Sequence, residues 1–320
     1  MRREIILAIG LQALSLVAVA QSLEVSPQDQ QIWLAWPDGK REQLTHGPQN
    51  ANAPAWSADH ASIAYFRYCP LPAQCDPALV MVDPSGKVLK EFSLAATSDW
   101  DGCGAVMKID FLDSRRIGFH CHINPSLGEY TTMDPSSGQM LRHWLGFAFT
   151  WSPDKSHIAH HGWIPHFSPP FAHSSYLQID DQTVYPPEAI TGASVSEGPH
   201  GARLEMHAIE KWGGLYRNIH EFGQFFWAPD SKKAAFIDRV YDWKEVENQP
   251  QDVGEQNVRR FLVIAGLGIK SSTLPDVKSC NSQSRIEWRY DNELDFVCGA
   301  GSTRYVIDKA GILSESKRIP

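Results

Sequence analysis

A short pattern that recurs along the chain limits its possible folds more than any other feature. Residues 151–159 read WSPDKSHIA: an aromatic residue, a polar turn and a short apolar strand. The pattern returns without a gap at 56–64, WSADHASIA, and at 227–235, WAPDSKKAA, with looser copies at Phe111 and Trp288. A unit repeated in this way is typical of repeat architectures, in which each unit stacks on its neighbours.

A second pair of strands follows each copy, joined by turn residues such as those at 83–86, 134–138 and 308–311. The order strand, turn, strand, loop, strand, turn, strand predicts an all-β chain: a β-propeller of four-stranded antiparallel blades. We expect six blades within a single domain at 21–320, with five or seven as alternatives. Residues 188–223 lack this rhythm and are expected to be an irregular blade or an insertion. The hairpin at 31–45 should complete a blade with C-terminal strands and so close the ring.

Four segments carry a family resemblance: QIWLAWPDGKREQLT at 31–45, PAWSADHASIAYF at 54–66, TWSPDKSHIAHH at 150–161 and FWAPDSKKAAFID at 226–238. They resemble the TolB-like β-propeller repeat, within the WD-repeat-like superclass, over about residues 31–316. This resemblance implies a fold and leaves the function open. Only residues 21–30 separate the predicted leader from the first hairpin, so no counterpart of the N-terminal domain of TolB is expected. A role in the Tol–Pal system therefore does not carry over.

The N-terminus reads as a secretory signal peptide over residues 1–20. Arg2 and Arg3 precede an apolar stretch that ends with small residues at Ala18 and Ala20. This arrangement predicts cleavage after Ala20, whereas the alternative, a membrane anchor, would require a longer apolar segment. We therefore expect a periplasmic or secreted protein with no membrane span after cleavage.

The charge balance excludes some partners. The full sequence has a net charge of −8, and the leader contributes two Arg and one Glu, so the mature chain is more acidic still. An acidic exported protein is poorly suited to nucleic acid or to an anionic membrane surface.

Six cysteines lie beyond the predicted leader, and an even number in an oxidising compartment indicates disulfides. The stretches 103–121 and 280–298 align without a gap, and each begins and ends with Cys. Two antiparallel strands joined by a turn bring their far ends together, which predicts the pairs Cys103–Cys121 and Cys280–Cys298. The remaining pair is Cys69–Cys75. Metal binding is the alternative, but no CxxC or paired Cys–His spacing supports it.

A functional face is expected where loops follow the second strand of each blade and join one blade to the next. These loops are rich in His, Arg, Asp and aromatic residues, whereas the opposite turns are plain SPD-type turns. The candidate binding residues are Arg67, Tyr68, His120, His122, His160, His161, Trp163, Asp238 and Arg239.

The histidines allow an alternative that involves a metal. His120, His122, His160 and His161, with His166 and His173 nearby, could converge on one divalent ion such as zinc or manganese. Against this, His160 and His161 are adjacent and would point to opposite sides of a strand, and no acidic ligand accompanies them. The simpler interpretation is polar loop residues bonded to the backbone, with no cofactor.

No catalytic signature is present, and the G-x-S-x-G motif of propeller-associated peptidases is missing. The sequence therefore favours a non-enzymatic role: an exported binding module for a protein, peptide or glycan of the cell envelope. One alternative is a metal-dependent propeller enzyme, a lyase or hydrolase acting on a saccharide or lactone. Another is a structural scaffold of the cell envelope.

Overall fold

The computed structural model describes residues 21–70, 75–94, 105–124, 127–162, 176–186, 193–198, 201–206, 215–244, 255–269, 271–275, 285–298, 301–308 and 312–319. Throughout these ranges the chain forms strands and turns, and none of it is helical, which confirms the all-β class. Consequently no described segment is a helix long and apolar enough to cross a membrane. The predicted signal peptide at 1–20 lies outside the described residues.

The first two sheets are antiparallel meanders of consecutive strands. The first has three strands, β1 (Ser22–Val25), β2 (Ile32–Ala35) and β3 (Arg41–Gln43). The second has four, β4 (Asn50–Trp56), β5 (Ile63–Tyr68), β6 (Ala78–Val82) and β7 (Val88–Ser93). Trp56 pairs with Ile63 across the first turn, so the repeated sequence pattern corresponds to the first two strands of a meander.

The next two meanders form one continuous sheet of seven strands because they share β11. The strands are β8 (Ala105–Asp113), β9 (Arg116–Asn124), β10 (Leu127–Met133), β11 (Met140–Trp151), β12 (Ile158–His161), β13 (Leu177–Ile179) and β14 (Gln182–Tyr185). The first half of β11 pairs with β10 up to Gly146, and the second half pairs with β12 from Phe147. One strand thus ends one meander and begins the next.

The irregular segment predicted at 188–223 contains a hairpin and a strand. The hairpin comprises β15 (Ala193–Gly198) and β16 (Gly201–Met206), which pair with each other and with no other described strand. The strand, β17 (Leu215–Phe222), joins a sheet with β18 (Phe226–Trp227), β19 (Lys233–Lys244), β20 (Glu255–Gly266) and β21 (Ser272–Pro275). Both β18 and β17 pair with β19, at its beginning and its end respectively.

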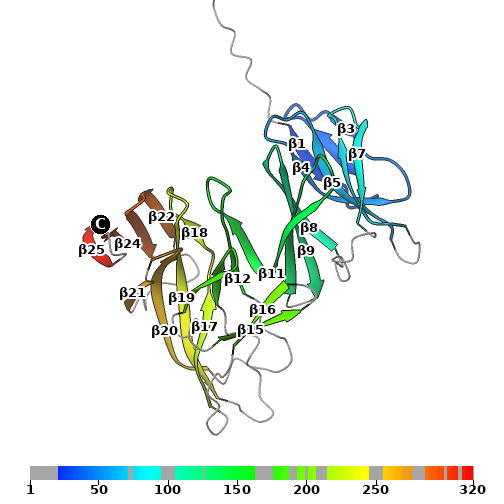
Figure 1. Ribbon diagram of the computed structural model, residues 1–320. Helices are drawn as coiled ribbons and strands as arrows, with labels where there is room; N and C mark the ends of the chain where they lie inside the picture. Colours follow the sequence, from blue (N-terminus) through cyan, green and yellow to red (C-terminus); the bar gives the residue numbers. More distant parts are fainter. Residues whose placement is uncertain are drawn as a thin grey trace, which may run out of the picture.

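The final sheet is a complete four-stranded meander. Its strands are β22 (Arg285–Tyr290), β23 (Glu293–Cys298), β24 (Gly301–Ile307) and β25 (Leu313–Ile319). The expected ring closure is therefore wrong: β25 pairs with β24, while the hairpin of β2 and β3 is completed by β1. The sheets follow one another in an open arc whose first and last members lie apart (Figure 1). The number of six blades remains a prediction.

Apolar side chains form the core between adjoining sheets. One cluster joins Ala159 and Leu177 of the seven-stranded sheet to Phe236 and Val263 of the next. The aromatic residues of the repeated pattern pack on such clusters, as expected from the sequence: Trp56, Phe111, Trp151, Trp227 and Trp288. Burial of these rings supplies the main stabilisation between units that would be unstable alone.

Candidate functional site

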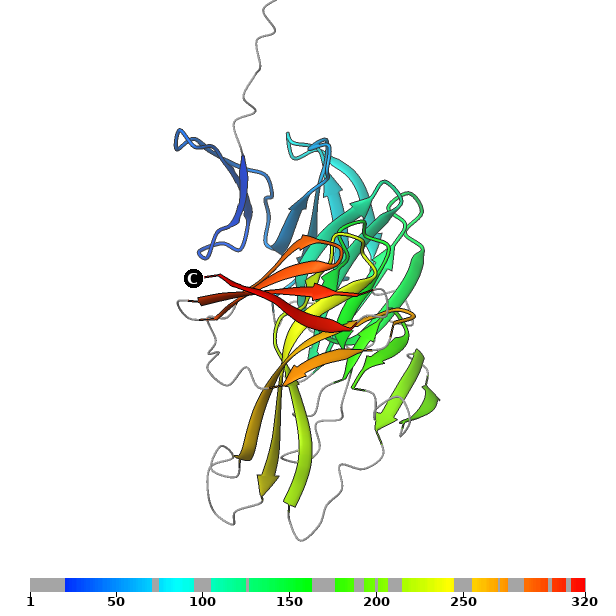
Figure 2. The same ribbon diagram turned by 90° about the vertical axis from the view of Figure 1, so that its left-hand side faces the viewer.

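Each meander has two ends that differ in their connections. The first strand of each four-stranded meander, called here the inner strand, leads through a tight turn to the second strand. The end that carries these turns is the turn rim. The second strands β5, β9, β12, β19 and β23 all run away from it, and the end toward which they run is the loop rim. There β19 continues with β17 and β20 as an arm that extends past the other sheets (Figures 1 and 2).

Side chains at the turn rim bond to their own turns. Ser152 Oγ donates to Asp154 Oδ1 at 2.7 Å, and the same oxygen accepts from the backbone N–H of Ser156 at 2.9 Å. Hydrogen bonds from Ser156 and Ser152 hold the pKa of Asp154 well below its usual range. The backbone N–H of Asp154 also donates to Ser231 Oγ in the next sheet, at 3.2 Å. The polar side chains of the turn rim thus stabilise their own turns and the contact with the next sheet.

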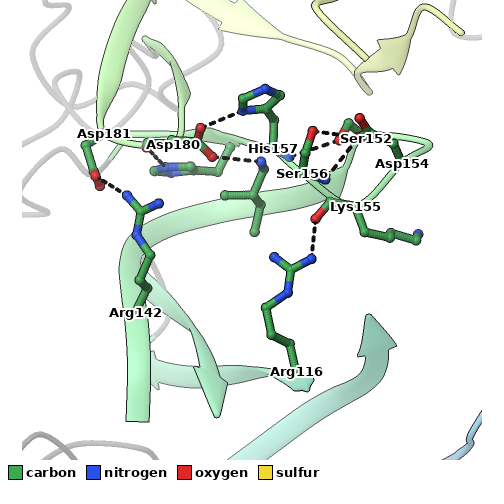
Figure 3. A network of polar contacts seen from close by, with 11 residues as sticks. Arg116, Arg142, Ser152, Asp154, Lys155, Ser156, His157, Asp180 and Asp181 are labelled. Carbon is green, nitrogen blue, oxygen red and sulfur yellow. Dashed lines mark hydrogen bonds and ion pairs between the residues drawn. The ribbon is translucent and has the colours of Figure 1, made fainter. Parts of the chain in front are cut away.

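Figure 3 shows further polar contacts at the turn rim. His157 Nδ1 lies 2.7 Å from Asp180 Oδ2, and Arg116 donates to the backbone oxygen of Lys155 at 2.8 Å. Arg142 pairs with Asp181 at the adjacent turn. Charged groups here are matched to neighbours within the same or the adjoining unit.

The loop rim contains a buried polar cluster around Asp238. Asp238 Oδ2 lies 2.7 Å from His220 Nδ1 and accepts the Tyr185 hydroxyl at 2.8 Å. Asp238 has no exposed surface, and His220 and Tyr185 are buried as well. The aromatic rings of Phe222 and Phe236 pack on Tyr185 at 5.6 and 5.5 Å. The second carboxylate oxygen, Asp238 Oδ1, is buried without a hydrogen-bond partner.

His161 lies between the same two sheets. Its ring meets Phe225 at 4.8 Å and Phe222 at 5.4 Å, both edge-on, and its Nε2 has no hydrogen-bond partner. Burial, together with His160, lowers the pKa of His161 to about 4, and the backbone of Gly223 opposes this shift. His161 is therefore neutral at pH 7.

The histidines proposed as metal ligands are separated by an aromatic ring. Phe149 meets His120 edge-on at 5.1 Å and stacks on His160 at 5.2 Å. Burial lowers the pKa of both His120 and His160, whereas His122 is exposed. The ring nitrogens of His160 lie 3.3 and 3.2 Å from the backbone oxygens of His161 and Asp180. This arrangement agrees with the interpretation of the histidines as polar residues bonded to the backbone.

Among the residues that the structure describes, no group of three His, Cys, Asp or Glu side chains could hold a metal ion. His166, His173 and Trp163 lie outside those residues. The metal site thus remains an untested expectation of the sequence.

The predicted arginines both form ion pairs. Arg67 binds Glu91 with two guanidinium nitrogens, and these hydrogen bonds raise its pKa, while its buried Nε has no partner. Arg239 binds Glu221 at 2.6 Å and also Glu255. Burial opposes the charge of Arg239, but the two glutamates outweigh it and raise the pKa.

Next to Arg67, Tyr68 ends β5 and stacks on Phe66 at 5.6 Å. The Cys69–Cys75 disulfide follows it and is confirmed. Cys121 is buried and disulfide-bonded, but its predicted partner Cys103 lies outside the described residues.

The three predicted residues His160, His161 and Asp238 are interior side chains of this rim, not exposed ones. The structure adds two residues that the sequence did not suggest, Tyr185 and His220. No spacing links either of them to Asp238, because β14, β17 and β19 meet only in the folded sheets.

No protein-family model matches this chain, and no curated protein sequence matches it. In three dimensions it is similar to TolB from Acinetobacter baumannii, with 13% identity, a TM-score of 0.33 and a match over 88% of this chain and 61% of that one. It is also similar to oligogalacturonate lyase from Vibrio parahaemolyticus, at 15% identity and a TM-score of 0.40 over 89% and 70% of the two chains. A third similar structure is the β-propeller domain of the Trilobed protease from Pyrococcus furiosus, at 10% identity and a TM-score of 0.36 over 91% and 76%. At these identities and TM-scores the similarity assigns no function, and less than two thirds of TolB is spanned.

Proposed function

We propose that this chain is an exported binding module that holds a polar ligand of the cell envelope at the loop rim. One observation carries the proposal. Within the described ranges, the ionisable side chains that have a buried atom without a hydrogen-bond partner are Arg67 at Nε, His161 at Nε2 and Asp238 at Oδ1. All three lie on second strands toward the loop rim, on β5, β12 and β19.

Unpaired atoms of this kind are costly. A buried polar atom without a partner costs about 1–3 kcal/mol, so each one in a folded protein calls for a reason. At the turn rim the equivalent polar side chains are bonded to their own turns, which shows that this chain can satisfy such groups. We infer that a bound ligand supplies the missing hydrogen-bond partners at the loop rim.

The unpaired atoms also suggest the ligand chemistry. Asp238 Oδ1 accepts hydrogen bonds, Arg67 Nε donates, and neutral His161 does one or the other at Nε2. His161 and Asp238 lie in adjoining sheets, with the rings of Phe222 and Phe225 beside them. A ligand with both donors and acceptors and an apolar face fits this setting: a glycan, or the backbone of a peptide or protein segment.

Binding to arrays of oligosaccharides and of peptides tests the proposal. The mature chain is compared with Asp238→Asn and His161→Phe, and with Asp59→Asn, which changes an exposed side chain at the turn rim. We expect ligands that bind the wild type and Asp59→Asn but are lost in the two loop-rim variants. Circular dichroism establishes that each variant is folded. The proposal fails if neither array yields a ligand, or if every ligand binds the loop-rim variants as tightly as the wild type.

A further inference from the structure

Among the described strands, the first sheet has one fewer than the later meanders. Its described strands are β1, β2 and β3, whereas every later meander has four and begins with its inner strand, which is β4, β8, β11, β18 or β22. In the fifth sheet, β17 is an additional strand beside β19. The inner strands contact one another along the arc: β4 packs on β8, and β18 packs on β22. On its other side β4 packs on β1 instead.

The turns show which strand is missing. The turn between β2 and β3 is closed by the backbone N–H of Trp36, which donates to Lys40 O at 2.9 Å. The turn between β6 and β7 is closed in the same way, by Asp83 N–H to Lys87 O at 3.0 Å. Because β6 and β7 are third and fourth strands, β2 and β3 are as well, and β1 is a second strand. The vacant position is the inner one, next to β1.

A tryptophan contact repeats between consecutive meanders. The indole N–H of Trp227 donates to the backbone oxygen of Thr150 at 2.9 Å, and that of Trp288 donates to the backbone oxygen of Phe226 at 2.8 Å. Both acceptors lie on the inner strand of the preceding meander, one residue before its terminal aromatic residue. Trp56 has the same place in the second sheet, and its indole nitrogen is buried without a partner. The acceptor that the repeat would supply belongs to the missing strand.

Trp151 also lacks an acceptor, although the inner strand before it, β8, is present. Its ring lies edge-on to Tyr130 and to Trp144, at 5.8 Å from each. For Trp56, by contrast, no preceding inner strand is present among the described residues.

One face of β1 packs against the core, as in an interior strand of a sheet. Leu23 and Val25 pack on the cluster that also contacts Trp56, while Ser22 and Glu24 are exposed on the other face. Glu24 is paired with Arg41 at 2.7 Å. Among the described strands, β1 pairs with β2 alone. The backbone groups along its other edge can therefore pair with an added strand.

We propose that the edge of β1 binds an extended peptide segment of a partner protein as a fourth, innermost strand. Main-chain hydrogen bonds hold the segment antiparallel to β1, and alternate apolar side chains continue the face made by Leu23 and Val25. One of its carbonyl groups accepts the N–H of Trp56. This surface is separate from the loop rim and does not depend on the ligand proposed there.

Synthetic peptides that copy this chain's own inner strands, at 50–56, 105–113, 147–151 and 285–290, serve as probes for the mature protein. Fluorescence anisotropy gives their affinities, and hydrogen–deuterium exchange reports on the amides of β1. We expect at least one peptide to slow exchange in β1. N-methylation of alternate backbone nitrogens should weaken that peptide about tenfold or more, since it removes main-chain donors.

The Trp56→Phe variant keeps a ring in place and removes the donor, so peptide affinity should fall about five- to tenfold. The matched control, Trp288→Phe, should leave it unchanged, and thermal unfolding establishes that both variants are folded. The proposal is overturned if no peptide slows exchange in β1 or if the N-methylated peptide binds equally well. It is also overturned if sedimentation shows a dimer, hydrogen–deuterium exchange places its interface on β1, and the peptides do not compete with the second copy.

Discussion

The Tyr185 hydroxyl donates a 2.8 Å hydrogen bond to Asp238 Oδ2 across the boundary between two neighbouring sheets. Tyr185 ends β14, and Asp238 lies on β19, which also receives β17 with His220. The contact joins the seven-stranded sheet to the sheet that follows it. A carboxylate with no exposed surface therefore organises the loop rim between these two sheets.

Replacing Tyr185 by Phe should destabilise the protein by about 1–3 kcal/mol, because a buried carboxylate oxygen loses one of its two partners. Urea denaturation measures this loss. Tyr65→Phe is the matched control, since Tyr65 is also buried and its hydroxyl has no hydrogen bond to any described residue. Equal losses in the two variants would contradict the role assigned to the Asp238 contact.

Replacing Trp227 by Phe should cost more stability than replacing Trp56 by Phe. Both changes shrink a packed ring, but only Trp227 loses a hydrogen bond, to Thr150 of the preceding sheet. The difference in the free energy of unfolding should be about 1 kcal/mol. Urea denaturation of the two variants, without any peptide, provides the comparison, and a larger loss for Trp56→Phe would argue against the repeated indole contact.

The repeated pattern made the fold predictable where local sequence determines it. Copies at 56–64, 151–159 and 227–235 mark the beginning of three meanders, because an aromatic residue and a Ser/Asp turn suffice to form the first two strands. Ring closure was not predictable in this way. Ser22–Val25 lacks the repeat pattern, yet it pairs with β2 and completes the hairpin for which the sequence predicts C-terminal strands.

The candidate site could be predicted only in part. Asp238 and His161 stand out because they follow the short apolar runs of the repeat's second strands, so their position toward the loop rim could be inferred from the sequence. Their burial could not, because it depends on how β14 and β17 pack beside them. His220 belongs to the irregular segment at 188–223, where the sequence has no periodicity from which to place a side chain.

Stability should fall as the pH drops below neutrality, with His161 as one source. In the unfolded chain this histidine takes up a proton near its ordinary pKa of 6.5, but in the folded protein its pKa is about 4. The unfolded state therefore binds more protons between these values, and stability is lost as the pH falls from about 6.5 to about 4. Burial lowers the pKa of His160 in the same direction.

Between pH 7 and pH 5 the contribution of His161 is on the order of 2 kcal/mol. Urea denaturation at the two pH values should show a smaller loss for His161→Phe than for the wild type. The control His122→Phe, at an exposed position on β9, should retain the wild-type loss. An unchanged pH dependence in His161→Phe would mean that His161 is not buried as a neutral group.

Replacing Gly146 by Ala should be among the most damaging single changes in the sheets. Gly146 has φ +151°, and an added Cβ would lie 2.0 Å from the backbone oxygen of His161, at the point where β11 passes from one meander to the next. Backbone strain and this clash should cost about 2–4 kcal/mol. Gly39→Ala separates the two effects, because Gly39 also has a positive φ, +87°, but nothing lies within 4 Å of an added Cβ. It should cost about 1 kcal/mol, from strain alone. Thermal and urea denaturation of the pair measure the difference, and equal losses would show that His161 and β12 can move away from β11 at little cost.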